Sequence, residues 1–262
     1  MLRRSPEAAL FEAVVRRYLV VAGLRPQPGE RGSEGGPDFI CGEGSVAVEA
    51  KCLTIDKVAR ATGLPDLPMA HGSSYAFPTS AIRKAVTEKA AQAPVGVPYV
   101  VAIGTFHFMG AWMVFDRRGA EFVLVGKPVI VWPVAPGGDC AGEMSEKIDP
   151  APASFYVHDA SLDGTLDAIN RDVGGVLLLG LGAVQQETQP SRLVRDAHLV
   201  LNPGARAPVD PAAFRGSAHI LRLSDGWRSG EIAVESLAPE RPLRSRRGDA
   251  GDEAEETANH RT

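Results

Sequence analysis

The sequence lacks the features that would assign it to a specialised class of protein. It has three cysteines in 262 residues and no Cys-x-x-Cys pair, which excludes a disulfide framework and a zinc ribbon and predicts reduced thiols. No apolar run approaches the roughly 18 residues that a membrane helix needs, and the longest, Val176 to Val184, is interrupted by glycines. We therefore expect no membrane partner and interpret that run as a buried strand.

An excess of positive charge is also absent. Lys and Arg number 28 against 32 Asp and Glu, a formal net charge of −4, which excludes a histone-like nucleic-acid coat but not a local basic groove. Arg3 and Arg4 are not followed by the apolar segment of a signal peptide, because Glu7 and Glu12 interrupt it. These absences predict a cytoplasmic protein.

What the sequence does contain is an ordinary globular composition with patterned segments. Apolar residues make up 44% and charged residues 23% of the chain. Residues 6–22 carry apolar side chains at helical spacing between Ser5 and Pro6, a good cap pair, and Gly23, a good terminating residue. This segment is predicted to form an amphipathic helix.

The other elements are predicted from short runs that Gly, Pro and polar residues separate. Strands are expected at 37–41, 45–52, 99–103, 112–115, 122–125, 129–134, 176–184, 198–201, 219–223 and 231–234, helices at 79–93 and 161–171, and loops at 25–36 and 53–77. Three regions follow: 1–135 with an insertion at 53–77, an α/β extension at 136–240, and a disordered charged tail at 241–262.

The first region carries charged residues where two predicted strands meet. Asp38 begins one strand, and Glu49 and Lys51 share one face of the next because side chains alternate along a strand. If Gly42 to Ser45 form the connection, Asp38 lies directly opposite Glu49; a three-residue loop would place them on opposite faces.

Two carboxylates that close together repel each other, and a divalent cation between them relieves the repulsion. Mg²⁺ is typically held by one or two carboxylates together with water and phosphate oxygens. Lys51 could then orient or help deprotonate a water and stabilise charge on a phosphate oxygen. The implied reaction is metal-assisted hydrolysis of a phosphodiester.

The sequence contains Pro37-Asp38, then a gap of ten residues, then Glu49-Ala50-Lys51. This pattern resembles the motif of the PD-(D/E)XK nuclease superfamily, which includes restriction endonucleases and Holliday-junction resolvases. The resemblance covers about residues 5–104. It implies an α/β fold with a restriction-endonuclease-like αβββαβ core, a mixed central sheet flanked by helices, followed here by a β-rich C-terminal extension. One of the three strands of that core has no counterpart among the predicted elements.

The resemblance also implies roles for individual residues. Asp38 and Glu49 would bind Mg²⁺, with Mn²⁺ as a substitute, the backbone carbonyl of Ala50 would join them, and Lys51 would serve catalysis. Glu12 on the first helix would face the metal, with Glu7 as the poorer candidate. Contacts to a nucleic-acid backbone are expected from a loop serine and from polar residues of the second helix: Ser33, Lys84, Lys89 and Gln92.

The leading hypothesis is therefore a Mg²⁺-dependent nuclease that hydrolyses DNA, in restriction, defence, repair or recombination; RNA remains open as a substrate. Related folds cleave duplexes as dimers, so a homodimer is one expectation. A second hypothesis is a catalytically silent scaffold that binds nucleic acid, or binds a protein partner through the C-terminal region. A third is a hydrolase of small phosphorylated substrates. The plainest alternative makes Asp38 a turn residue and Glu49 and Lys51 a solvated strand face.

Overall fold

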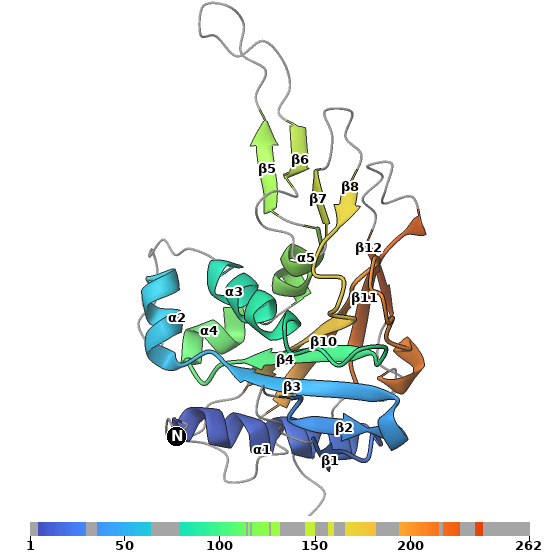
Figure 1. Cartoon of the computed structure of the whole chain (residues 1–262). Coiled ribbons are helices and arrows are strands. Elements are labelled where there is room, and N and C mark those ends of the chain that lie inside the picture. Colours follow the sequence, from blue (N-terminus) through green and yellow to red (C-terminus); the bar gives the residue numbers. More distant parts are fainter. Residues whose placement is uncertain are drawn as a thin grey trace, which may run out of the picture.

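In the computed structural model, the chain forms an eight-stranded mixed β-sheet flanked by helices (Figure 1). The structure describes residues 5–29, 36–63, 79–113, 115, 117–125, 127–131, 145–149, 157–159, 166–181, 194–214, 217–225 and 234–237. The strands of the sheet are β1 (Gln27–Pro28), β2 (Phe39–Cys41), β3 (Val46–Cys52), β4 (Tyr99–Gly104), β9 (Gly175–Leu181), β10 (Val194–Leu201), β11 (His219–Leu223) and β12 (Val234–Leu237).

The spatial order of the strands is β1-β2-β3-β4-β9-β10-β11-β12. Strand β2 is antiparallel to both β1 and β3, whereas β3, β4 and β9 run parallel to one another. Strand β10 is antiparallel to β9 and parallel to β11, and β12 is antiparallel to β11. Two further hairpins, β5 (Lys127–Val131) with β6 (Ser145–Asp149) and β7 (Val157–Asp159) with β8 (Leu166–Ala168), project from one side of the molecule (Figure 1).

Helix α1 (Pro6–Val21) confirms the predicted N-terminal helix. The Ser5 hydroxyl accepts a hydrogen bond from the backbone N–H of Ala8 at 3.2 Å, which satisfies one of the donors exposed at a helix start. Beyond the helix, Gly23 has φ +82°, a conformation that glycine adopts without steric cost. The apolar stripe of α1 is buried: Phe11, Val14, Val15, Tyr18 and Leu19.

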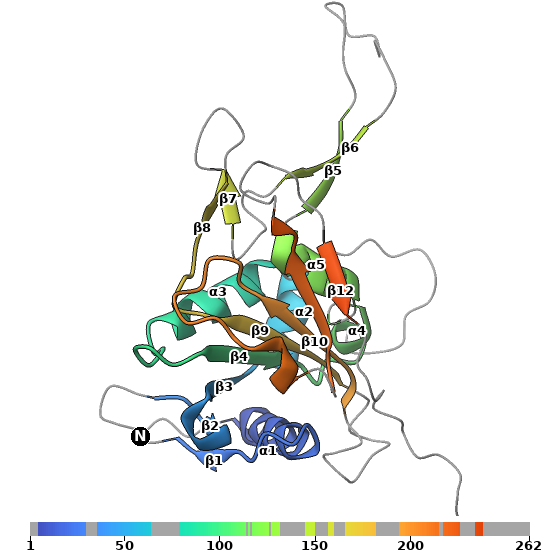
Figure 2. The same cartoon turned by 90° about the vertical axis from the view of Figure 1, so that its right-hand side faces the viewer.

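The helices cover the two faces of the sheet unequally. Helix α1 packs on one face, in a core that also contains Val46 and Val48 of β3. Helices α2 (Ile55–Thr62), α3 (Thr79–Ala90) and α5 (Arg117–Val125) contribute to the second core, on the opposite face (Figure 2). A charged side chain of β3 that points away from α1 therefore points toward α2 and α3.

The sheet also crosses the boundary predicted at residue 135. Strand β9 pairs with β4 on one side and with β10 on the other, so strands from both predicted regions form one hydrogen-bonded sheet. Both cores likewise contain residues from each side of that position. The charged tail predicted at 241–262 lies outside the described residues.

Several local predictions were wrong. The predicted loop 25–36 contains β1, and the predicted loop 53–77 contains α2, a helix of eight residues that is shorter than the stretch over which a helical pattern is normally recognised. The strands predicted at 112–115 and 122–125 overlap α4 (Phe108–Met113) and α5 instead. The predicted helix 161–171 contains β8, and of the strand predicted at 231–234 only residue 234, the start of β12, lies within the described residues.

The error at α5 has a clear cause. The run Phe122 to Val125 has strand-forming residues, but tertiary packing overrides this local preference. Ala120, Val123 and Leu124 are buried at helical spacing against the second core. Among the described residues, no helix has the length and apolar character of a membrane span.

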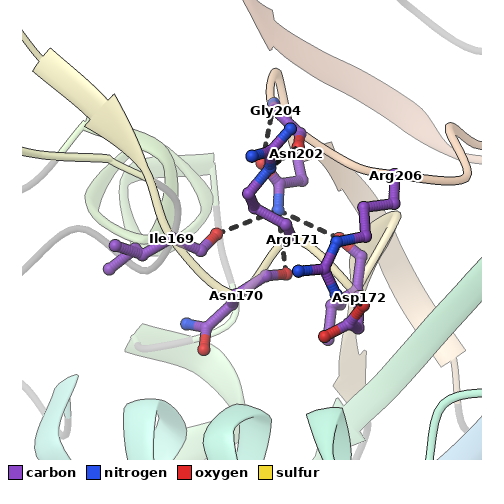
Figure 3. Close-up of polar contacts among 8 residues, drawn as sticks. Ile169, Asn170, Arg171, Asp172, Asn202, Gly204 and Arg206 are labelled. Atoms are coloured by element: carbon purple, nitrogen blue, oxygen red, sulfur yellow. Dashed lines mark hydrogen bonds and ion pairs between the residues drawn. The ribbon is translucent and has the colours of Figure 1, made fainter.

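Asn202 ties together the turn that precedes β9 and the end of β10 (Figure 3). Its buried Nδ2 lies 3.0 to 3.2 Å from the backbone carbonyl oxygens of Ile169, Asn170 and Val173, and its Oδ1 accepts from the Gly204 N–H at 2.9 Å. One amide side chain thus satisfies backbone groups of two segments about 30 residues apart.

Replacing Asn202 by alanine is expected to lower the free energy of unfolding by about 2–3 kcal/mol, because buried carbonyls lose their donor. Urea denaturation measures the change. Arg206→Gln is the control, since the ion pair of Arg206 with Asp172 is exposed and worth less than about 1 kcal/mol. A loss in the alanine variant no larger than that of the control would show that Asn202 does not hold this junction.

Candidate metal and catalytic site

The hairpin of β2 and β3 has the register that brings the predicted site residues together. Gly42 and Gly44, in the connecting turn, have φ +54° and +94°, which glycine adopts readily. Cys41 pairs with Val46 and Phe39 with Val48, which confirms the predicted four-residue connection. Extended by one residue, this register places Asp38 opposite Glu49, and the Asp38 backbone N–H and the Asp38 charge both act on the Glu49 carboxylate.

Asp38 is fixed against the second strand by a direct hydrogen bond. Its side chain is only 5% exposed, and its Oδ2 accepts from the backbone N–H of Ala50 at 3.0 Å. The carboxylate therefore bridges to the middle of the Glu-x-Lys segment. This contact is not that of a solvated turn residue, which was the plainest alternative for Asp38.

Glu49 is the more strongly perturbed of the two carboxylates. It is 4% exposed and forms an ion pair through Oε1 with Nζ of Lys89 on α3, whereas its buried Oε2 has no hydrogen-bond partner among the described residues. Burial raises the pKa of Glu49, and the charge of Asp38 raises it further, while the hydrogen bond and charge of Lys89 oppose the rise. Below, we call Asp38 and Glu49 the acidic pair.

The acidic pair fits a divalent cation. Two buried carboxylates face each other, one of their oxygens lacks a partner, and hard oxygen donors are the ligands that Mg²⁺ and Mn²⁺ accept. Within the described ranges, no group of three or more His, Cys, Asp or Glu side chains gathers as a ligand set. A cation at the acidic pair would therefore complete its shell with water, backbone and phosphate oxygens, as Mg²⁺ commonly does.

Lys51 extends from the same face of β3 as Glu49. Its Nζ lies 3.6 Å from Oε2 of Glu88 on α3, and its side chain is 29% exposed. The other oxygen of Glu88 lies 3.8 Å from Nζ of Lys84. Lys51 is thus held beside the acidic pair and remains accessible to a substrate.

The two candidate glutamates of the first helix lie in different environments. Oε2 of Glu7 accepts from the Ile55 N–H at 3.0 Å, next to the C-terminal end of β3, where its charge adds to burial in raising the pKa of Cys52. Glu12 is half-buried on α1, which covers the face opposite to that of Glu49 and Lys51. A metal-binding role of Glu12 stays a prediction.

The residues predicted to contact nucleic acid have different environments. Ser33 lies outside the described residues, and Lys84 is exposed on α3. Lys89 donates to Oε1 of Gln92 at 2.9 Å and pairs with Glu49, so it belongs to the site and not to an outward-facing surface. A contact of Ser33, Lys84, Lys89 or Gln92 with nucleic acid stays a prediction.

Tyr99, at the start of β4, is a site residue that the sequence did not reveal. Its side chain is fully buried, its hydroxyl has no hydrogen-bond partner among the described residues, and Glu49 and Asp38 add to the rise in its pKa that burial causes. Tyr99 pairs with Ala47 across the parallel β3–β4 ladder. Because that pairing joins segments about 50 residues apart, no local pattern placed Tyr99 beside the acidic pair.

The raised pKa of Glu49 predicts a pH dependence of stability in metal-free protein. The folded state holds the Glu49 proton at pH values where the unfolded chain has released it, so unfolding free energy falls as pH rises from about 4.3 toward the raised pKa. Urea denaturation in EDTA across this pH range is expected to show a smaller fall in unfolding free energy for Glu49→Gln than for wild type. Parallel curves for the two proteins would contradict the assignment.

Comparison with protein-family models, with curated proteins and with solved structures gave no match in any of the three. The functional assignment therefore depends on the geometry of the site itself.

Proposed function

We propose that this protein is a metal-dependent nuclease that hydrolyses phosphodiester bonds of DNA. The observation that carries the proposal is the acidic pair, two buried carboxylates with an unsatisfied oxygen, beside Lys51 on the same sheet face. A solvated strand face would leave both carboxylates exposed to water. The resemblance to the PD-(D/E)XK motif assigns the same three residues.

The order of elements supports the finer assignment to a restriction-endonuclease-like core. Helix α1, strands β1 to β3, helix α3 and strand β4 follow one another, with α2 inserted before α3. In this assignment, strand β1 would be the strand that had no predicted counterpart. The antiparallel β1-β2-β3 meander, joined in parallel to β4, gives the mixed sheet that this core requires.

In the proposed mechanism, Asp38, Glu49 and the Ala50 carbonyl would hold Mg²⁺ or Mn²⁺. Such an ion, when bound, polarises a phosphoryl oxygen and lowers the pKa of water. The hydrogen bond from the Ala50 N–H fixes the Asp38 carboxylate, and Lys89 screens the charge of Glu49. Lys51 donates a hydrogen bond to the attacking water or to the phosphate oxygen on which negative charge develops.

The experiment is incubation of wild type and Lys51→Ala with supercoiled plasmid, linear duplex and single-stranded DNA, and RNA, each with Mg²⁺, Mn²⁺ or EDTA. We expect metal-dependent cleavage of DNA that Lys51→Ala lowers at least about 100-fold. Products from the supercoiled and linear substrates distinguish internal from terminal cleavage. Binding of nucleic acid without cleavage in any metal would overturn the proposal.

That outcome would favour the silent scaffold. The ion pair between Lys89 and Glu49 supports the silent-scaffold hypothesis, because this pair already neutralises one carboxylate of the acidic pair without a metal.

A further inference from the structure

Three lysines gather around one carboxylate next to the acidic pair. Lys51 and Lys84 approach the two oxygens of Glu88, at 3.6 Å and 3.8 Å. Lys57, on α2, lies close enough to both lysines for their charges to add to burial in lowering its pKa, with Glu88 opposing. Lys51, Lys57 and Lys84 form what we call the lysine cluster.

The lysine cluster is assembled from three separate elements. Lys51 comes from β3, Lys57 from α2 and Lys84 from α3, and α2 packs against α3. Among the described residues, Glu88 is the carboxylate that lies between Lys51 and Lys84 and opposes the effect of their charges on Lys57. Like charges brought together in this way destabilise the unliganded protein, and a concentration of one sign of charge attracts a ligand of the opposite sign.

We propose that Lys57 and Lys84 bind the phosphate that neighbours the cleaved one in a nucleic-acid backbone. The proposal rests on the proposed function, because Lys51 connects the lysine cluster to the acidic pair. Lysine ammonium groups bind phosphate oxygens as point charges, without the fixed geometry of a guanidinium. Helix α2 thereby supplies a contact to the substrate that the sequence analysis did not assign.

The exposure of the lysine cluster favours a nucleic-acid strand over a small phosphorylated ligand. The side chain of Lys84 is 69% exposed and that of Glu88 45% exposed. Sites for small ligands usually enclose most of the ligand surface in a concave pocket. A backbone that passes across the cluster needs no such enclosure, because its neighbouring phosphates add further contacts.

The test is the equilibrium binding of fluorescein-labelled single-stranded and duplex DNA, measured by anisotropy in EDTA at several salt concentrations. The variants are Lys57→Gln and Lys84→Gln. The control is Arg17→Gln, which removes the same charge from the exposed side of α1, on the other face of the sheet. Working without metal separates this test from the proposed function, because binding can be measured whether or not the protein cleaves DNA.

We expect each lysine variant to weaken binding several-fold at low salt and to reduce the slope of log affinity against log salt by about 1, with no change in Arg17→Gln. Lysine variants that match the control would overturn the proposal. Displacement of DNA by inorganic phosphate at low millimolar concentration would also overturn it, because the cluster would then be a site for a free phosphate group. Thermal unfolding of each variant verifies that the fold is retained.

Discussion

Asp38→Asn is expected to reduce metal-dependent cleavage at least about 100-fold. The change removes one negative charge from the acidic pair and leaves the shape of the side chain almost unchanged. A divalent cation then has one carboxylate fewer, and phosphoryl transfer loses the charge stabilisation that the cation supplies.

The same substitution should leave the fold intact. The amide oxygen of the new side chain can still accept from the Ala50 N–H, as Oδ2 of Asp38 does. Asp56→Asn is the matched control, because Asp56 is exposed in the first turn of α2 and undergoes the same chemical change. Rates of plasmid cleavage and thermal unfolding curves are compared for all three proteins; an Asp38→Asn variant as active as the Asp56 control would contradict the assignment.

Lys89→Met is expected to destabilise metal-free protein by about 3 kcal/mol at neutral pH. Lys89 and Glu49 have side chains only 18% and 5% exposed, and removal of one partner leaves a buried charge without compensation. The loss of unfolding free energy should be smaller at lower pH, because Glu49 can then take up a proton. Burial already raises the pKa of Glu49.

A double-mutant cycle tests this account of Lys89. Lys89→Met in a Glu49→Gln background should cost much less than in wild type, because no buried negative charge is left. Lys84→Met is the control, since its pair with Glu88 is exposed and worth less than about 1 kcal/mol. Chemical denaturation gives the four free energies, and a cost of Lys89→Met that is the same in both backgrounds would rule out the ion pair as its cause.

The part of the fold that the sequence predicted best is the part with strong local signals. Helix α1 has a cap, an apolar stripe and a terminating glycine, all within residues 5–23. The β2–β3 hairpin has its glycines in the turn and its alternation in β3, which together fix the register and place Asp38 opposite Glu49. The hairpin alone thus led to the predicted juxtaposition of Asp38 and Glu49.

The surroundings of the site could not be predicted in the same way, because they depend on packing between distant segments. Helix α2 was missed because it has only eight residues, and Lys57 was missed with it. The ion pairs of Glu88 with Lys51 and of Lys89 with Glu49 depend on the packing of α3 over β3. The addition of β9 to β12 to the same sheet depends on pairings that no local pattern specifies.

The central claim is that the acidic pair binds a divalent cation, and a calorimetric titration of Mn²⁺ into metal-free protein at neutral pH tests it most directly. We expect a saturable heat of Mn²⁺ binding in wild type. Glu49→Gln and Asp38→Asn should each lower the Mn²⁺ affinity at least about tenfold, while Asp56→Asn leaves it unchanged. Absence of any saturable heat in wild type up to millimolar Mn²⁺, or equal binding by all four proteins, would contradict it.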